Sequence, residues 1–336
     1  MADSTTTVQS AQARAVTQNR SRSRIQWSAY LYILPAYVII VMFHIIPVFY
    51  AIYISMNKGP INKFVWVGLD QYLRALGGQE FWNSLVTTFM YAGLTMPFTI
   101  ALALFFAYLL YQPFVKVRGA FRAIFFLPYV VSTVGSSIVW AWIFDPRSGL
   151  ANAALKSVGI PALRWLIEPT GIFEVLAKNM GGTIPAWASG PSLALIAISI
   201  FSIWQAMGYD IVIFLAGLTN IPGELYEAAR IDGASGWTLF RHITLPLLAP
   251  TTFFVVVISV IGSLQSFNHI FTMNRASAQS LGGPLGSTST LTVYMFDQLY
   301  TNSNYGYATA VAILLSLIIL AFTLFNFKFL GKRVQY

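Results

Sequence analysis

Six apolar stretches constrain the fold of this chain more than any other feature. Each is about 20 or more residues long and almost free of charged side chains, and about 20 apolar residues span a bilayer as a helix. The pattern therefore predicts an all-α membrane protein with six transmembrane helices. The stretches cover residues 27–54, 81–111, 123–144, 193–219, 247–273 and 305–327.

The composition supports a membrane protein and excludes several kinds of site. Charged residues make up only 9% of the chain, whereas a soluble domain carries roughly 25%. The absence of cysteine excludes disulfides, thiol catalysis and thiolate metal sites. The three histidines lie far apart and show no ligand spacing, so we predict no metal site.

The basic residues predict the orientation of the chain. The net charge is +9, but the basic residues cluster beside the apolar stretches, which favours a topological role over nucleic-acid binding. Six spans place both termini on one side, and that side holds twelve of the 20 Lys and Arg residues. Four of the other eight fall in the long loop 145–190, where the positive-inside rule is weak. We therefore expect both termini in the cytoplasm.

The remaining segments complete the predicted domain organisation. Residues 1–26 are polar and are expected to form a disordered cytoplasmic tail, and residues 331–336 a cytoplasmic C-terminus. The segment 27–330 is then one six-span domain. Its loop 145–190 is predicted to be an external cap with one or two helices, and 274–304 another external loop.

The polar loop 220–246 contains more helix-forming sequence than a short turn needs. About two turns of good helix formers at 224–231 end at Asp232-Gly233, and Gly233 is predicted to adopt positive φ and turn the chain. A second short helix then leads to Leu245-Pro246. A helical cytoplasmic loop of this kind indicates a docking surface for a partner. The simpler alternative is a helix that rests on lipid headgroups.

Local chemistry supports the first of these helices. Thr219 or Asn220 is predicted to cap its N-terminus, and Pro222 suits its first turn. Glu224 and Glu227 follow in the first two turns, where the helix dipole favours negative charge.

The spacing of this loop resembles the EAA loop in the permease subunits of binding-protein-dependent ABC importers. The matching residues are Glu227-Ala228-Ala229, Gly233, Ile243, Leu245 and Pro246. Further segments resemble the carbohydrate-uptake branch, in particular the first permease subunits of the maltose and glycerol-phosphate type. They include Leu34-Pro35, Phe126-Leu127-Pro128, Leu215-Ala216-Gly217-Leu218 and Gly282-Gly283-Pro284.

The resemblance implies a docking site and a set of partners. In this family the loop helix sits in a cleft of an ATPase subunit and passes its closure to the spans. The residues that would couple to the ATPase here are Glu224, Glu227, Ala228, Ala229, Arg230, Asp232, Gly233, Ile243, Leu245 and Pro246. The implied partners are a second homologous permease subunit, two cytoplasmic ATPase subunits, an extracytoplasmic solute-binding protein and a sugar. The implied location is the cytoplasmic membrane of a bacterium or archaeon.

The sequence gives no sign of catalysis in this chain. It lacks a G-x-x-x-x-G-K-[ST] phosphate loop, so ATP and Mg²⁺ are expected on the partner ATPase. Asp145 and Asp297 are isolated acids, better explained as solvated or capping residues. Two other classes of function fit the sequence less well. An ion-coupled secondary transporter needs buried ionisable groups, of which only Asp210 qualifies. A membrane enzyme acting on lipid-linked sugars needs acidic or metal-binding loops, which the chain lacks.

Polar and aromatic residues within the spans are candidates for a substrate path. They are Trp204, Gln205, Tyr209, Asp210, Gln265, Asn268 and Tyr294. Aromatic faces stack on sugar rings, while amides and carboxylates bond sugar hydroxyls. The structural alternative is that the aromatic residues anchor or pack helices and that the amides bond between helices.

Asp210 lies deep in its apolar stretch. A carboxylate at that depth costs roughly 2.5–3.5 kcal/mol if it faces lipid. Asp210 should therefore face the bundle interior or a watery cavity. There it would bond substrate hydroxyls, a neighbouring helix or the partner permease.

Overall fold

The computed structural model describes residues 27–60, 62–185 and 188–329, and the predicted tail 1–26 and C-terminus 331–336 lie outside them. The chain divides into two compact units, 1–53 and 54–336. The described part of the first unit is helical, with α2 (Trp27–Ile40), a π-helical turn (Val41–Ile45) and the start of α3 (Ile46–Ser55). Pro47 lacks the N–H that a regular α-helix would use, which explains the wider turn just before it.

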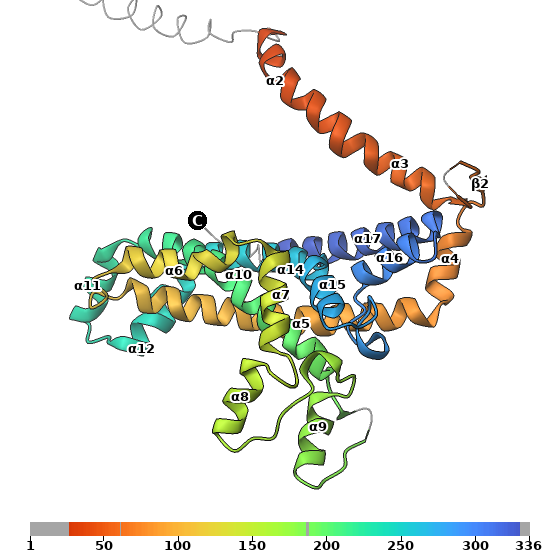
Figure 1. Ribbon diagram of the computed structural model, residues 1–336. Coiled ribbons are helices and arrows are strands. Elements are labelled where there is room, and N and C mark those ends of the chain that lie inside the picture. Colours follow the sequence, from red (N-terminus) through yellow and green to blue (C-terminus); the bar gives the residue numbers. More distant parts are fainter. Residues whose placement is uncertain (1–26, 61, 186–187, 330–336) are drawn as a thin grey trace, which may run out of the picture. The chain divides into compact units, whose positions relative to one another are not determined.

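The second unit is a series of helices that follows one small hairpin (Figure 1). The hairpin pairs β1 (Asn57–Lys58) with β2 (Val65–Trp66) in antiparallel register. The helices are α4 (Asp70–Gly77), α5 (Gln79–Tyr111), α6 (Arg118–Val130), α7 (Thr133–Ile143), α8 (Leu150–Ser157), η2 (Trp165–Ile167), α9 (Ile172–Asn179), α10 (Leu193–Thr219), α11 (Gly223–Ile231), α12 (Gly236–Leu239), η4 (Phe240–Thr244), α13 (Leu245–Leu247), α14 (Ala249–Leu264), α15 (Asn268–Ala276), η5 (Pro284–Gly286), α16 (Leu291–Tyr300) and α17 (Tyr305–Phe329).

The all-α membrane fold is confirmed, but two predicted spans are not continuous. Within the described residues four helices are long and apolar enough to cross a membrane: Tyr30–Ser55, α5, α10 and Tyr305–Lys328. Two bent helix pairs raise that number to six if each pair is one span. The stretch 123–144 breaks between α6 and α7 with a bend of 94°. The stretch 247–273 divides into α14 and α15, and α14 itself meets the preceding helix at 66°.

Local backbone conformation explains both interruptions. Val131 is extended and Ser132 has φ −51° and ψ 119°, so both lie outside the helical region. The Ser132 hydroxyl accepts a bond from the Gly135 N–H and so caps α7. Phe267 has φ −138° and ψ −59°, outside the helical region, immediately before α15. The apolar sequence does not predict such breaks, because the hydrophobic pattern continues across them.

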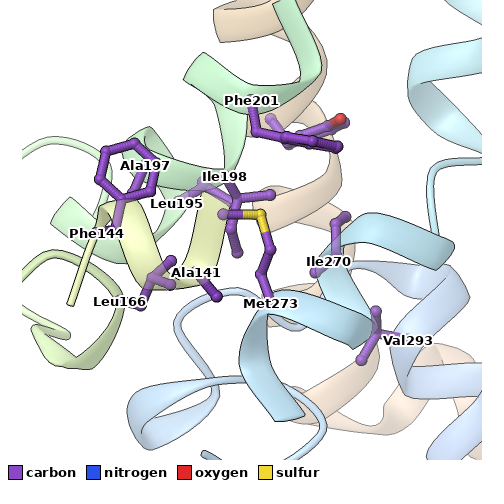
Figure 2. Packing of buried hydrophobic residues seen from close by; sticks show 11 residues of the cluster. Ala141, Phe144, Leu166, Leu195, Ala197, Ile198, Phe201, Ile270, Met273 and Val293 are labelled. Carbon is purple, nitrogen blue, oxygen red and sulfur yellow. The ribbon is translucent and has the colours of Figure 1, made fainter. Parts of the chain in front are cut away.

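The centre of the unit is α10, which packs most extensively against α5 and α6. One end of α10 belongs to a cluster in which Leu195, Ile198 and Phe201 meet Ile270 and Met273 of α15 (Figure 2). A second cluster joins the C-terminal part of α10 to α5 and α14 through residues that include buried Phe214, Leu218 and Val255.

The loops contain more helix than the apolar pattern indicates. The segment 145–190 holds α8, η2 and α9, which confirms the predicted helical content of that loop. The segment 274–304, predicted as a loop, contains η5 and the ten-residue helix α16. Tyr294 of α16 is buried against α17. A helix of ten residues is too short to be predicted as a membrane span from the sequence. Tertiary packing against α17 holds it in place.

Candidate functional site

A cavity of about 370 Å³ lies where α5, α10 and α14 approach one another. The bend between α6 and α7 and the start of α15 complete its wall. Its described lining residues are Thr95, Met96, Thr99, Tyr129, Thr133, Ser202, Gln205, Ala206, Tyr209, Asp210, Ile258, Ser259, Gly262, Ser263, Ser266 and His269. Nine of these sixteen residues carry a hydroxyl, and Asp210 is the only Asp or Glu among them.

Three residues predicted for the substrate path meet in this cavity. Gln205, Tyr209 and Asp210 all lie on α10, and all three line it. Gln205 Nε2 donates to Thr133 Oγ1 at 2.9 Å, which fixes its side chain beside the bend. The ring of Tyr209 stacks on Tyr129, with centroids 4.7 Å apart and planes 21° apart.

Asp210 faces this interior, as expected for a carboxylate at its depth. It is 4% exposed and lines the cavity. The only ion pair among the described residues joins Lys178 to Glu174 in the segment 145–190. Asp210 takes no part in that ion pair. Its two predicted roles, bonding to a substrate or to a neighbouring helix or partner subunit, both remain predictions.

A close contact at Gly208 positions this part of α10. A Cβ at Gly208 would collide with the carbonyl oxygen of Phe125 on α6. Only glycine lets the two backbones approach this closely, and the approach brings Tyr129 of α6 over Tyr209.

A chain of polar side chains holds α15 against the cavity. The Tyr91 hydroxyl on α5 donates to Ser202 Oγ at 2.7 Å and lies 2.7 Å from Nε2 of His269. Tyr91 is fully buried and His269 is 7% exposed. Sequence reasoning singled out neither residue for the site. Thr95 and Thr99 were also missed, although their spacing of one helical turn on an apolar helix is a detectable signal.

The other four candidates for the path lie outside this cavity. Trp204 packs against Trp140 and Phe201, with ring centroids 5.2 Å and 5.9 Å away, as the packing alternative proposed. Gln265 and Asn268 are exposed at the break between α14 and α15. Tyr294 lines a second cavity of about 350 Å³ with Glu80 and Asp297, and its hydroxyl lies 3.1 Å from that of Tyr307.

The loop 220–246 folds as two helical pieces, as predicted. Gly233 has φ +83°. The Gly233 N–H donates to Arg230 O at 3.0 Å, and the Ala234 N–H donates to Ala229 O at 2.9 Å, which is the bond pair of a Schellman motif. The predicted N-cap is wrong. Pro222 occupies that position without a side-chain bond, because α10 continues through Thr219 to its C-cap Asn220 and α11 begins only at Gly223.

Buried contacts anchor this loop and leave one surface open. The Tyr226 hydroxyl lies 3.0 Å from Thr244 Oγ1, and Phe240 packs on Tyr108 of α5 at a centroid distance of 4.8 Å. Burial raises the pKa of Tyr226. Of the ten residues predicted to couple, Ala229 and Ile243 are half-buried. The eight exposed ones are Glu224, Glu227, Ala228, Arg230, Asp232, Gly233, Leu245 and Pro246.

Two further residues extend this open surface. The side chains of Ile231 and Trp237 are 87% and 69% exposed. Sequence reasoning did not include them, although large apolar residues in a polar loop are a visible signal. We define these eight exposed residues, together with Ile231 and Trp237, as the loop face.

The isolated acid Asp145 has a local structural role, as predicted. Its Oδ1 accepts bonds from the Arg147 N–H at 3.0 Å and the Ser148 N–H at 2.8 Å. These bonds lower the pKa of Asp145, with the Ser148 backbone as the largest cause.

Residues 75–336 match the family described as "binding-protein-dependent transport system inner membrane component". The chain belongs to this family. The match contains both the cavity and the loop face, so the two features lie in the part of the chain that defines an inner membrane component. Such a component is a transport subunit and not a catalytic one, which confirms the resemblance stated from the sequence.

Named relatives cover most of the chain. The trehalose/maltose transport system permease protein MalF of Thermococcus litoralis is 33% identical over 89% of this chain and 92% of its own length. The arabinooligosaccharides transport system permease protein AraP of Bacillus subtilis is 31% identical over 90% of this chain and 88% of its own. A solved bacterial ABC transporter involved in import of the acidic polysaccharide alginate matches with a TM-score of 0.72 and 22% identity. It covers 92% of this chain and 96% of the matched chain, and it supports the fold of this transport component.

Proposed function

We propose that this chain is a permease subunit of an ATP-driven importer for sugars or oligosaccharides. It forms half of the translocation path, and a second homologous permease forms the other half. The observation that carries the proposal is the cavity around Gln205, Tyr209 and Asp210, in which hydroxyls, an amide, a carboxylate and stacked tyrosines converge. Sugars present hydroxyls and apolar ring faces, which this combination suits. The permease relatives named for trehalose, maltose and arabino-oligosaccharides support the same substrate class.

The loop face supplies the proposed link to ATP hydrolysis. Its exposed charged residues and its apolar Ile231 and Trp237 suit a cleft in a cytoplasmic ATPase subunit. Two such ATPase subunits would hold ATP and Mg²⁺, since this chain has no phosphate loop. Movement of α11 would reach η4 through the contact between Tyr226 and Thr244. It would then reach α5, which lines the cavity, through Phe240 and Tyr108.

The remaining proposals concern the assembly. An extracytoplasmic solute-binding protein would deliver the sugar, and both termini would lie in the cytoplasm of a bacterium or archaeon. Family membership does not favour the ion-coupled transporter or the enzyme acting on lipid-linked sugars.

Reconstitution tests the proposal. The complete transporter is placed in liposomes with its binding protein outside and ATP inside. Uptake of radiolabelled trehalose, maltose and arabino-oligosaccharides is then measured. We expect at least one to accumulate only when both ATP and the binding protein are present. Uptake that follows a proton or sodium gradient and ignores ATP would contradict the proposal.

A further inference from the structure

We propose that the cavity favours neutral carbohydrates over anionic ones, and that Asp210 is the residue that determines this specificity. The inference rests on the proposed function, because it concerns the charge of a carbohydrate in that same cavity.

Among the described residues the cavity is lined by one carboxylic acid, Asp210, and by no lysine or arginine. His269 is the only other ionisable residue apart from two tyrosines, and its Nε2 lies within hydrogen-bond distance of the Tyr91 hydroxyl.

The basic residues of the surrounding helices lie elsewhere. α5, α7, α10 and α14 contain no lysine or arginine. α6 carries Arg118 and Arg122 near its N-terminus. Arg122 lines a different cavity with Val212 and Thr219. Arg275 lies in the last turn of α15 and is absent from the cavity lining.

This arrangement suits hydroxyls and opposes carboxylates. A sugar hydroxyl can donate to Asp210, and the serine and threonine hydroxyls of the wall can donate or accept. An anionic sugar would bring a second negative charge near Asp210, in surroundings where charges interact more strongly than in water. It would also meet none of the arginine or lysine groups that usually bind carboxylate and phosphate.

The fold does not dictate this preference. The solved transporter for the acidic polysaccharide alginate shares the fold. The contribution of this chain to charge selection must therefore come from the residues that line its cavity. Asp210 supplies the only carboxyl group there among the described residues.

Sugar binding to the assembled transporter, measured in the absence of the binding protein, tests the inference. The selectivity of the binding protein then does not affect the result. The probes are radiolabelled methyl glycosides of glucose, galactose and mannose, each paired with its uronide, which differs only by a carboxylate at C6. Maltose and trehalose serve as larger neutral probes. Equilibrium binding is measured on the full nucleotide-free complex in nanodiscs. We expect each bound glycoside to bind at least about tenfold more tightly than its uronide, as one nearby like charge predicts.

Three variants separate the contribution of Asp210. Asp210→Asn keeps the shape and is expected to reduce the preference by about fivefold or more. Ser263→Lys adds a cation to the same cavity and should shift the preference toward the uronide, which keeps the test decisive if Asp210→Asn does not assemble. Asp297→Asn removes an acid from the second cavity and should leave the ratio unchanged.

The outcomes distinguish this inference from the proposed function. The inference is overturned if neutral glycosides and uronides bind equally to the wild type, or if Asp210→Asn leaves the ratio of their affinities unchanged. Either result leaves the assignment to sugars standing. If none of the glycosides or disaccharides binds saturably, the proposed function is contradicted together with the inference.

Discussion

The hydroxyl of Tyr91 lies 2.7 Å from Nε2 of His269, although 178 residues separate them in the sequence. The same hydroxyl donates to Ser202. One buried phenol therefore connects α5, α10 and α15 at the wall of the cavity. This contact holds the short helix α15, which begins after a break in the backbone, against the long helices.

Replacement of Tyr91 by phenylalanine tests this contact. Tyr91→Phe leaves the His269 ring and the Ser202 hydroxyl without their partner, which should lower stability by about 1–3 kcal/mol. Thermal unfolding of the purified complex measures the change. Tyr300→Phe is the matched control, because Tyr300 is 71% exposed. Equal unfolding temperatures for both variants would show that the contact contributes nothing.

Gly208 should not tolerate even one added methyl group. Gly208→Ala places a Cβ against the Phe125 carbonyl, and the resulting overpacking should destabilise the protein by about 1–3 kcal/mol. It should also separate Tyr129 from Tyr209 and weaken sugar binding. Gly93→Ala is the control, since nothing lies within 4 Å of a Cβ at Gly93. Wild-type stability and wild-type binding in Gly208→Ala would mean that α6 and α10 do not meet as described.

Gly233 should matter for coupling rather than for insertion. Its φ of +83° makes any side chain strained, at about 1 kcal/mol. Gly233→Asp should leave the membrane level of the protein unchanged and reduce ATPase association or uncouple ATP hydrolysis from uptake. Glu227→Lys should do the same by reversing a charge on the loop face.

Gly223→Ala provides the control for the loop, because Gly223 has ordinary φ and open space around a Cβ. ATPase activity and sugar uptake are compared in the same liposomes. Full coupling in both Gly233→Asp and Glu227→Lys would refute the role of the loop face.

The predicted topology can be read from single cysteines, since the chain contains none. Arg230→Cys on the loop face should react with an impermeant thiol reagent only after the cells are opened. Lys156→Cys, on α8 of the predicted external loop, should react in intact cells. Both side chains are exposed, so accessibility depends on the side of the membrane. Labelling of Arg230→Cys in intact cells would show that the predicted orientation is wrong.

Local signals made the loop 220–246 predictable from the sequence. Its helix, its end at Asp232-Gly233 and the positive φ of Gly233 depend on neighbouring residues, and the structure has all three. The wrong N-cap at Thr219 or Asn220 shows the limit of such signals. Both residues belong to the end of α10, and the position where α10 stops relative to the start of α11 depends on more than the residue type.

The cavity could be predicted only in part, because it depends on tertiary contacts. Gln205, Tyr209 and Asp210 were found as polar residues within an apolar run. Trp204 looked equivalent in the sequence, but α10 turns it toward Trp140 and Phe201. His269 and Tyr91 pair across 178 residues, and no pattern in a single sequence indicates that contact.

Chemical modification at Ala206 tests the central claim most directly. Ala206 lies on the wall of the cavity between Gln205 and Tyr209. Ile200 lies on the same helix, is 40% exposed and does not line the cavity. Single cysteines at these positions are treated with a bulky thiol reagent, and ATP-driven sugar uptake is measured in liposomes. We predict that modified Ala206→Cys loses uptake while modified Ile200→Cys retains it. Undiminished uptake by fully modified Ala206→Cys would show that the substrate does not pass through this cavity.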